Sequence, residues 1–204
     1  MLGNDIEAWP RSSVMPVELA ALVYAQFLTS LGQPGDVAEF GVFRGETSRA
    51  FCDALAERGS AKRVHLFDTF AGLPADGPED GERNAVGIYK ATAEEVRATL
   101  RGCRNYQLHG GLIGTYVGVF AQPLCFAFVD VDLYQGTKDA LAICDRVLVP
   151  GGRIVIDDYD RGSWPGVKPA VDRWLDPTRY CCWTDHGLYF AERLSDARRS
   201  FSSR

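Results

Sequence analysis

The sequence predicts an α/β fold in which a mostly parallel sheet carries helices on both faces and ends in an antiparallel hairpin. Short apolar runs alternate with segments of helical periodicity along the chain, which is the pattern of parallel α/β proteins. The last two strand-like runs are separated only by Asp185, His186 and Gly187, which indicates a terminal hairpin. The 204 residues suit one hydrophobic core, so we expect residues 1–204 to form a single domain.

The expected elements follow one another along the chain. Apolar residues at helical spacing predict a helix at 17–31, within an amino-terminal segment, 1–35, that covers the sheet. Strands are expected at 37–43, 63–67, 105–109, 124–130, 153–157, 181–183 and 187–192. Further helices are expected at 47–58, 92–101, 136–148 and 168–175. Residues 72–91 are rich in Gly, Pro, Asp and Glu, which predicts a lid-like loop without a core element.

The composition argues against several classes of protein. The formal net charge is -5 and the pI is near 5.2, whereas proteins that bind nucleic acids usually carry a basic surface. The apolar runs are too short to span a bilayer, and residues 1–20 lack the basic start and apolar middle of a signal peptide. The six cysteines form no CxxC pair, which argues against zinc. We therefore expect a cytoplasmic protein whose partners include neither nucleic acid nor membrane.

Ligands of open α/β sheets bind beyond the carboxyl ends of the strands. At the first such end, Glu39 lies two residues before Gly41, and Gly45 precedes Thr47 and Ser48. The glycines permit a sharp turn close to a ligand, and the start of the next helix offers N–H groups and hydroxyls to an anion. The segment lacks the Gly-x-Gly-x-x-Gly fingerprint of dinucleotide sites. A turn that needs glycine for its geometry alone is an equal alternative.

Asp68 ends the second expected strand. An acid at this position can accept hydrogen bonds from both hydroxyls of a ribose bound over the neighbouring strand. Thr69 and Gly72 follow in a turn-like context, so the alternative role of Asp68 is that of a turn cap.

Four acids behind two later strands form the strongest local signal, namely Asp130, Asp132, Asp157 and Asp158. Side chains two residues apart share a face, so Asp130 and Asp132 converge if their strand persists, whereas the other two converge only through a turn. Four carboxylates at adjacent strand ends repel one another unless a cation neutralises them. Oxygen ligands suit Mg²⁺ or Ca²⁺. The alternative is a set of caps and surface acids that loops spread apart.

Four segments occur in a fixed order: EFGVFRG at 39–45, LFDTFAGLP at 66–74, VDVDLY at 129–134, and VPGG at 149–152 leading to IDDY at 156–159. Each is common by itself, but the ordered set is specific. Together they resemble the macrocin O-methyltransferase (TylF-like) family of class I methyltransferases. The resemblance covers the chain from about residue 37 to residue 174, and the segment at 68–74 is its most telling part.

The resemblance implies a Rossmann-like class I methyltransferase fold with a seven-stranded sheet. It also implies S-adenosylmethionine as cofactor, and a Mg²⁺ ion that positions a substrate with neighbouring hydroxyls. Members of the family methylate sugar hydroxyls, often on glycosylated natural products. The expected partner is therefore a small-molecule hydroxyl acceptor, and the habit of the family implies a homo-oligomer.

Site residues follow from the resemblance by motif. Glu39 and Gly41 would lie near the methionine part of the cofactor, and Asp68 would hold the ribose. The remaining cofactor-binding positions are Phe43, Arg44, Gly45, Thr47, Ser48, Thr69, Phe70, His109, Gly110 and Asp130. Asp130, Asp157 and Asp158 would ligate the metal, which leaves Asp132 as the catalytic base.

Other readings of these residues stay open at this point. His109 and His186 are rival bases, although a lone histidine is more often a packing or capping residue. An Asp-x-Asp strand end also suits a metal-dependent glycosyltransferase, but the early glycine turn and Asp68 argue against that class. A nicotinamide oxidoreductase is weaker still, because its glycine spacing is missing. A non-catalytic binding subunit on the same fold is a further alternative.

Overall fold

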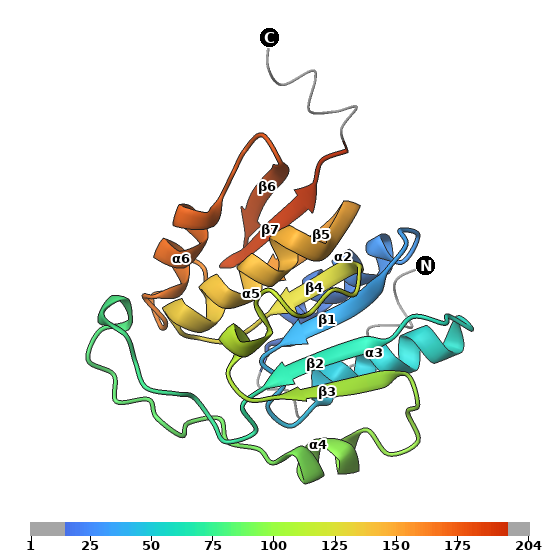
Figure 1. Cartoon of the computed structure of the whole chain (residues 1–204), viewed down its shortest axis with the longest axis horizontal. Coiled ribbons are helices and arrows are strands. Elements are labelled where there is room, and N and C mark those ends of the chain that lie inside the picture. Colours follow the sequence, from blue (N-terminus) through green and yellow to red (C-terminus); the bar gives the residue numbers. More distant parts are fainter. Residues whose placement is uncertain (1–14, 196–204) are drawn as a thin grey trace.

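A computed structural model describes residues 15–195 of the chain and shows one seven-stranded sheet (Figure 1). The strands lie in the order β3-β2-β1-β4-β5-β7-β6. Their bounds are β1 Asp36–Phe40, β2 Val64–Asp68, β3 Tyr106–Gly110, β4 Leu124–Val129, β5 Leu148–Ile156, β6 Tyr180–Asp185 and β7 Leu188–Arg193. The pairs within β1 to β5 are parallel, and β7 is antiparallel to both β5 and β6. The expected mostly parallel sheet with a terminal hairpin is confirmed.

Helices cover both faces of the sheet. They are α2 Val17–Ser30, α3 Glu46–Glu57, α4 Ala93–Thr99, α5 Tyr134–Val147 and α6 Val167–Trp174, with short 3₁₀ helices η1 Pro78–Asp80 and η2 Ile113–Tyr116. On one face Phe27 of α2, Phe51 of α3 and Phe126 of β4 pack with ring centroids 4.6 to 5.7 Å apart. On the other face Ala127 and Val129 pack in a second core cluster that includes residues of α5 and α6. The alternation of side chains along β4 therefore supplies one strand to two cores.

Several element bounds differ from the expected ones. β1 and β4 end at Phe40 and Val129, so the residues that follow lie in turns instead of on strand faces. β5 begins at Leu148, directly after α5, and so includes the Pro-Gly-Gly segment that the sequence had left outside the strand. A small residue is needed there because a Cβ at Gly152 would lie 3.0 Å from the carbonyl oxygen of Cys125. Residues 1–14 of the expected covering segment lie outside the described part of the chain.

The loop at 72–91 is fastened to the helices beside it. Asp80 is buried, and its carboxylate oxygens accept hydrogen bonds from the N–H of Gly77 at 2.8 Å and from the N–H of Tyr134, at the start of α5, at 2.7 Å. A Cβ at Gly166, before α6, would lie 1.9 Å from Asp80 Oδ1. The loop also places Ala85 in the core. The loop was expected to contain no core element, and it holds no strand or α-helix. It nevertheless contributes buried residues, because a capped acid and a small apolar side chain can both be buried in it.

Within residues 15–195, the structure shows no helix that combines the length and the apolar character needed to cross a membrane.

We predict that Gly41→Ala destabilises the protein. Gly41 has φ +86°, and a Cβ there would lie 1.7 Å from the carbonyl oxygen of Asp130 on the neighbouring strand end. Relief of this clash must separate β1 from β4, so we expect a loss of at least about 2 kcal/mol in the free energy of unfolding, measured in urea. Gly32→Ala is the matched control, because a Cβ at Gly32 meets no atom within 4 Å. Equal stability of the two variants would contradict the prediction.

Candidate functional site

A cavity of about 830 Å³ opens where the parallel strands end. Its volume lies in the upper part of the range found for small-molecule sites, about 300 to 1,000 Å³. Eleven of the residues predicted from sequence line it, namely Glu39, Gly41, Phe43, Arg44, Thr47, Asp68, Thr69, Asp130, Asp132, Asp157 and Asp158. The predicted residues outside its lining are Gly45, Ser48, Phe70, His109 and Gly110. The cavity therefore joins the glycine turn after β1 to the acids after β4 and β5.

Asp68 organises the turn after β1. Its Oδ2 accepts hydrogen bonds from the backbone N–H groups of Val42 at 2.8 Å and Phe43 at 3.1 Å, and its Oδ1 accepts one from Phe70 at 2.8 Å. The turn-cap role that the sequence left open is thus present in the structure. The hydroxyl of Thr69 also lies 3.5 Å from Oδ1, but its one hydrogen is shared with the carbonyl oxygen of Gly72, which is closer at 2.7 Å. A carboxylate has about four lone-pair sites, so the three backbone contacts leave Asp68 able to accept one further hydrogen bond from a ligand that displaces this long contact.

Glu39 lies at the base of the cavity with only 2% of its surface exposed. The hydroxyl of Ser48, in the first turn of α3, donates a hydrogen bond to Glu39 Oε2. Burial raises the pKa of Glu39 to about 8, and the nearby charge of Asp68 acts in the same direction. Ser48 is fully buried and its hydroxyl contacts the buried carboxylate of Glu39, which explains why it does not line the cavity.

His109 lies outside the cavity lining and packs behind one of the lining residues, Phe67. Its ring stacks on Phe67 with centroids 4.3 Å apart, and its Nε2 lies 3.1 Å from Nδ1 of His65. Burial lowers the pKa of His109 to about 4, and the neighbouring His65 adds to the effect. His186 lies in the exposed β6–β7 turn with Nδ1 2.6 Å from Asp185 Oδ1. Neither histidine is placed by these contacts to act as a base in the cavity.

Three more of the predicted residues, Gly45, Phe70 and Gly110, lie in turns or packing contacts outside the cavity lining. Gly45 precedes α3 with φ +81°, a conformation that favours glycine. The ring of Phe70 lies beside Gly110, where a Cβ would be 3.5 Å from Phe70 Cδ2.

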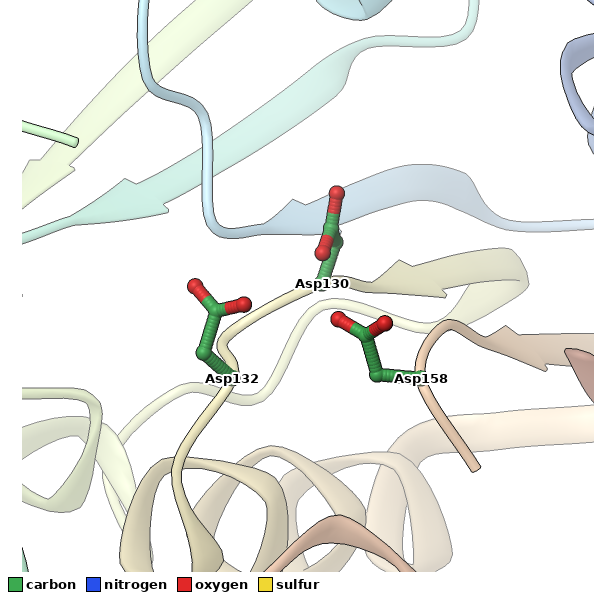
Figure 2. Close-up of side chains that lie close together, drawn as sticks. All are labelled: Asp130, Asp132 and Asp158. Carbon is green, nitrogen blue, oxygen red and sulfur yellow. The ribbon is translucent and has the colours of Figure 1, made fainter. Parts of the chain in front are cut away.

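Three carboxylates converge beside the glycine turn. Oxygen atoms of Asp130, Asp132 and Asp158 lie within 4.8 Å of one another. Figure 2 shows the first two on the segment after β4 and the third on the segment after β5, all turned toward one space. Asp132 and Asp158 have φ of +62° and +58°, so turns of the backbone, and not alternation along a strand, bring these side chains together.

Burial and mutual repulsion disfavour ionisation of these acids. Burial raises the pKa of Asp132 to about 8 and that of Asp158 to about 6, with the charges of Asp158 and of Asp157, respectively, as the next causes. The pKa of Asp130 is also raised, by burial and then by the charge of Asp157. An ion with two positive charges would offset this repulsion, and a donor set of carboxylate oxygens alone fits Mg²⁺ or Ca²⁺.

Asp157 is held differently from the other three acids. Its Oδ1 accepts a hydrogen bond from the N–H of Asp158 at 2.8 Å and lies 2.9 Å from Nη2 of Arg161. This contact is an ion pair without a hydrogen bond, because Nη2 of Arg161 is not aligned with any acceptor among the described residues. Arg161 therefore supplies a positive charge to the acidic side of the cavity.

Sequence reasoning missed several residues of the lining, including Tyr89, Arg161, Trp164 and the anchor Asp80. None of them belongs to a recognisable strand end. Tyr89 and Asp80 lie in the loop that was expected to act as a lid, which is the one signal that pointed toward them.

The sequence of this chain matches a known protein family. The model of the macrocin-O-methyltransferase (TylF) family matches residues 23–179. The chain belongs to this family. The match spans the glycine turn, Asp68 and all four acids, so the family segments recognised in the sequence and the cavity in the structure coincide.

Curated relatives of this TylF-family chain include two from Streptomyces. The 8-demethyl-8-(2,3-dimethoxy-alpha-L-rhamnosyl)-tetracenomycin-C 4'-O-methyltransferase of Streptomyces olivaceus is 33% identical over 178 residues, which cover 78% of this chain and 66% of the relative. The demethyldecarbamoylnovobiocin O-methyltransferase of Streptomyces niveus is 32% identical over 160 residues, which cover 69% and 58% of the two chains. The chain thus spans less than two thirds of the length of these relatives.

Among solved structures, the O-methyltransferase NovP matches with a TM-score of 0.77 and 25% sequence identity, over 94% of this chain and 87% of that chain. The shared fold confirms the class I methyltransferase architecture for this member of the TylF family.

We predict that Glu39→Gln flattens the dependence of stability on pH. Because the folded-state pKa of Glu39 is raised to about 8, ionisation is favoured in the unfolded state. Wild-type stability should therefore fall, relative to the variant, as the pH rises from about 4.5 to about 8, by on the order of 1 kcal/mol per pH unit. Urea unfolding of both proteins at pH 5 and pH 7.5 measures the difference. The substituted amide keeps an acceptor for Ser48, so parallel curves would show that Glu39 is not buried as described.

Proposed function

We propose that this chain is an S-adenosylmethionine-dependent O-methyltransferase that methylates a hydroxyl of a small molecule, a sugar of a glycosylated natural product, with the help of a divalent cation. The observation that carries the proposal is the single cavity that joins Glu39 and Asp68 to the convergent carboxylates, in a chain of the TylF family. The glycine-turn side would hold the cofactor and the acidic side the acceptor.

The cofactor side suits a charged amino acid attached to a ribose. Arg44 and Thr47 line the cavity near the start of α3, where backbone N–H groups favour an anion such as a carboxylate. Asp68 keeps one lone pair for a ribose hydroxyl after its three backbone contacts. S-adenosylmethionine supplies a methyl group on a positively charged sulfur, and the neighbouring acids favour that charge.

On the acidic side, Asp130, Asp157 and Asp158 are the proposed metal ligands and Asp132 is the proposed base. Asp130 and Asp158 belong to the convergent cluster. Asp157 is adjacent to Asp158 and contacts Arg161. Asp132, not Asp157, is the third acid whose oxygen lies within 4.8 Å of those of Asp130 and Asp158. A divalent cation at this position would lower the pKa of a hydroxyl bound to it.

The residues of the chain then have separate tasks in the transfer. The acceptor oxygen forms a bond to the methyl carbon as the bond from sulfur to that carbon breaks, and the electron pair stays on sulfur. Asp132 accepts the proton that the hydroxyl loses. The walls on either side hold the two reactants in line, which such displacements require.

The nature of the acceptor is proposed from the relatives. The two Streptomyces enzymes are O-methyltransferases of a rhamnosyl-tetracenomycin and of demethyldecarbamoylnovobiocin, and a third relative, from Micromonospora griseorubida, is a mycinamicin III 3''-O-methyltransferase. The family match gives no support to the glycosyltransferase or non-catalytic alternatives. A cytoplasmic location, a homo-oligomeric assembly and a single domain stay predictions from the sequence.

We predict that the protein binds S-adenosylhomocysteine and transfers methyl groups from S-adenosylmethionine to a glycoside in the presence of Mg²⁺. Calorimetry measures the first, and release of S-adenosylhomocysteine with mycinamicin III or demethyldecarbamoylnovobiocin as acceptor measures the second. Equal turnover in chelator and in Mg²⁺ would remove the metal from the mechanism. Failure to bind S-adenosylhomocysteine, together with binding of a nucleotide sugar that Mg²⁺ strengthens, would favour the glycosyltransferase alternative.

We predict that Asp132→Asn and Asp157→Asn both lower methyl transfer by about a hundredfold or more while leaving the affinity for S-adenosylhomocysteine unchanged. The two variants should differ in Mg²⁺ binding, measured by calorimetry without acceptor. Loss of Mg²⁺ binding in Asp157→Asn alone would support Asp132 as the base.

Loss of Mg²⁺ binding in Asp132→Asn alone would make Asp132 a ligand and contradict its assignment as the base. Asp160→Asn is the matched control, because Asp160 is an exposed acid that follows β5, close in sequence to Asp157 and Asp158, but lies outside the cavity lining. It should resemble the wild type in all three measurements.

A further inference from the structure

Part of the cavity wall consists of two aromatic side chains that the proposed chemistry does not use. Tyr89, from the loop at 72–91, and Trp164, from the segment between β5 and α6, both line the cavity with ring centroids 6.3 Å apart. We propose that Tyr89 and Trp164 position the acceptor, with the sugar ring packed on Tyr89 and an apolar group on that sugar lying toward Val86 and Ile88. This inference rests on the proposed function and adds the residues that select the acceptor.

Tyr89 stands between the two halves of the cavity. Its ring meets Phe43 of the glycine turn edge-on at 5.7 Å and faces Trp164 on the other side. Because Asp132 and Asp158 line the same cavity, a molecule that packs on Tyr89 can present its edge to the carboxylates. Tyr89 also remains 40% exposed, so its ring has free surface for a ligand.

The wall is held in place before any ligand arrives. Trp164 is buried, and the guanidinium carbon of Arg83 lies 4.4 Å from its ring centroid. Arg83 also donates a hydrogen bond to the carbonyl oxygen of Ser163. Together with the contacts of Asp80 to the start of α5, these interactions hold the loop on the amino-terminal side of Tyr89. Next to Tyr89, the N–H of Leu73 donates a hydrogen bond to the carbonyl oxygen of Ile88, and the N–H of Gly87 donates one to that of Leu73, both at 2.9 Å. A fixed wall lowers the entropy cost of binding.

The backbone at Tyr89 supports a selected position. Its φ is +54°, in the left-handed region that non-glycine residues seldom occupy and that costs about 1 kcal/mol or more. Glycine would relieve this strain but would remove the ring. The conformation therefore fits a position where the aromatic side chain is needed.

A pyranose ring matches this arrangement chemically. One face of the ring presents C–H groups, which pack on an aromatic ring, while the hydroxyls project from its edge and can reach oxygen ligands and a cation. Val86 is 66% exposed and Ile88 46% exposed in the same loop. Neither side chain lines the cavity, but both belong to the loop segment next to Tyr89, where exposed apolar surface favours contact with an apolar substituent on the sugar.

The charge of the cavity argues against a nucleotide sugar as the acceptor. Nine acidic residues and only two arginines line it, so a diphosphate group would find few positively charged partners there apart from the proposed cation. The acceptor that fits is an uncharged glycoside of an apolar aglycone. Methyl transfer by this chain would then follow the glycosyl transfer that supplies the glycoside.

Calorimetry on the protein saturated with S-adenosylhomocysteine and Mg²⁺ tests the inference. The glycoside probes are mycinamicin III, demethyldecarbamoylnovobiocin and 4-nitrophenyl α-L-rhamnoside, and the comparison ligands are TDP-rhamnose and L-rhamnose. We expect at least one glycoside to bind about tenfold or more tightly than both comparison ligands. Tyr89→Ala should remove most of that advantage and change the affinity for S-adenosylhomocysteine by less than about threefold.

Two further variants separate packing from folding. Tyr89→Phe keeps the ring and should keep the affinity for the glycoside. Trp183→Ala removes an exposed aromatic residue of β6 that stacks on Phe190 outside the cavity lining, and it should behave as the wild type does. Thermal unfolding of each variant confirms that it is folded.

The outcomes are distinguishable. TDP-rhamnose binding as tightly as the best glycoside, no glycoside binding at all, or unchanged glycoside affinity in Tyr89→Ala would each overturn the inference while leaving the cofactor site intact. Failure of the wild type to bind S-adenosylhomocysteine would instead overturn the proposed function itself.

Discussion

The convergence of carboxylates at the ends of β4 and β5 is the constraint on which the rest of the site depends. Asp130, Asp132 and Asp158 are brought within 4.8 Å by two turns with left-handed residues, although burial and repulsion both oppose their ionisation. Folding energy from the two cores must hold this arrangement together, because like charges at this distance do not assemble by themselves. The nearby guanidinium of Arg161 offsets part of the repulsion.

The same crowding links the acidic side to the glycine turn. Gly41 lies against the carbonyl oxygen of Asp130, so the strand end that presents the first acid also fixes the backbone beside the cofactor side of the cavity. Asp68 then holds the two N–H groups that follow Gly41. The glycine turn and the acidic cluster are therefore parts of one rigid unit, which suits the close alignment that the proposed reaction requires.

The sequence predicted the fold and most of the cavity because both depend on strong local patterns. Alternating apolar runs located every strand, and the ends of those strands located Glu39, Asp68 and the four acids. The sequence could not predict which acids converge. That depends on left-handed backbone conformations at Asp132 and Asp158, and because neither residue is a glycine, nothing in the sequence marks these conformations. The sequence also could not resolve the role of Asp68, because an acid that caps a turn and an acid that binds a ribose both occur at the end of a strand.

Residues on loops escaped prediction for a different reason. Tyr89, Arg161 and Trp164 are brought to the cavity by contacts between segments distant along the chain, such as Arg83 on Trp164. His109 shows the converse case: its strand-end position suggested a ligand contact, but stacking on Phe67 turns the ring toward the core. Neither outcome follows from spacing alone.

The anchoring of the loop at 72–91 has a consequence for how acceptor preference can diverge. Asp80 closes against Tyr134 and Gly166 at the base of this loop, so three segments of the chain meet there with no room for a larger side chain. The tip, from Glu82 to Tyr89, carries mostly exposed side chains. The contacts of Asp80 can thus stay unchanged while the tip is replaced. This short stretch is therefore a suitable unit to graft between homologues in order to change the acceptor.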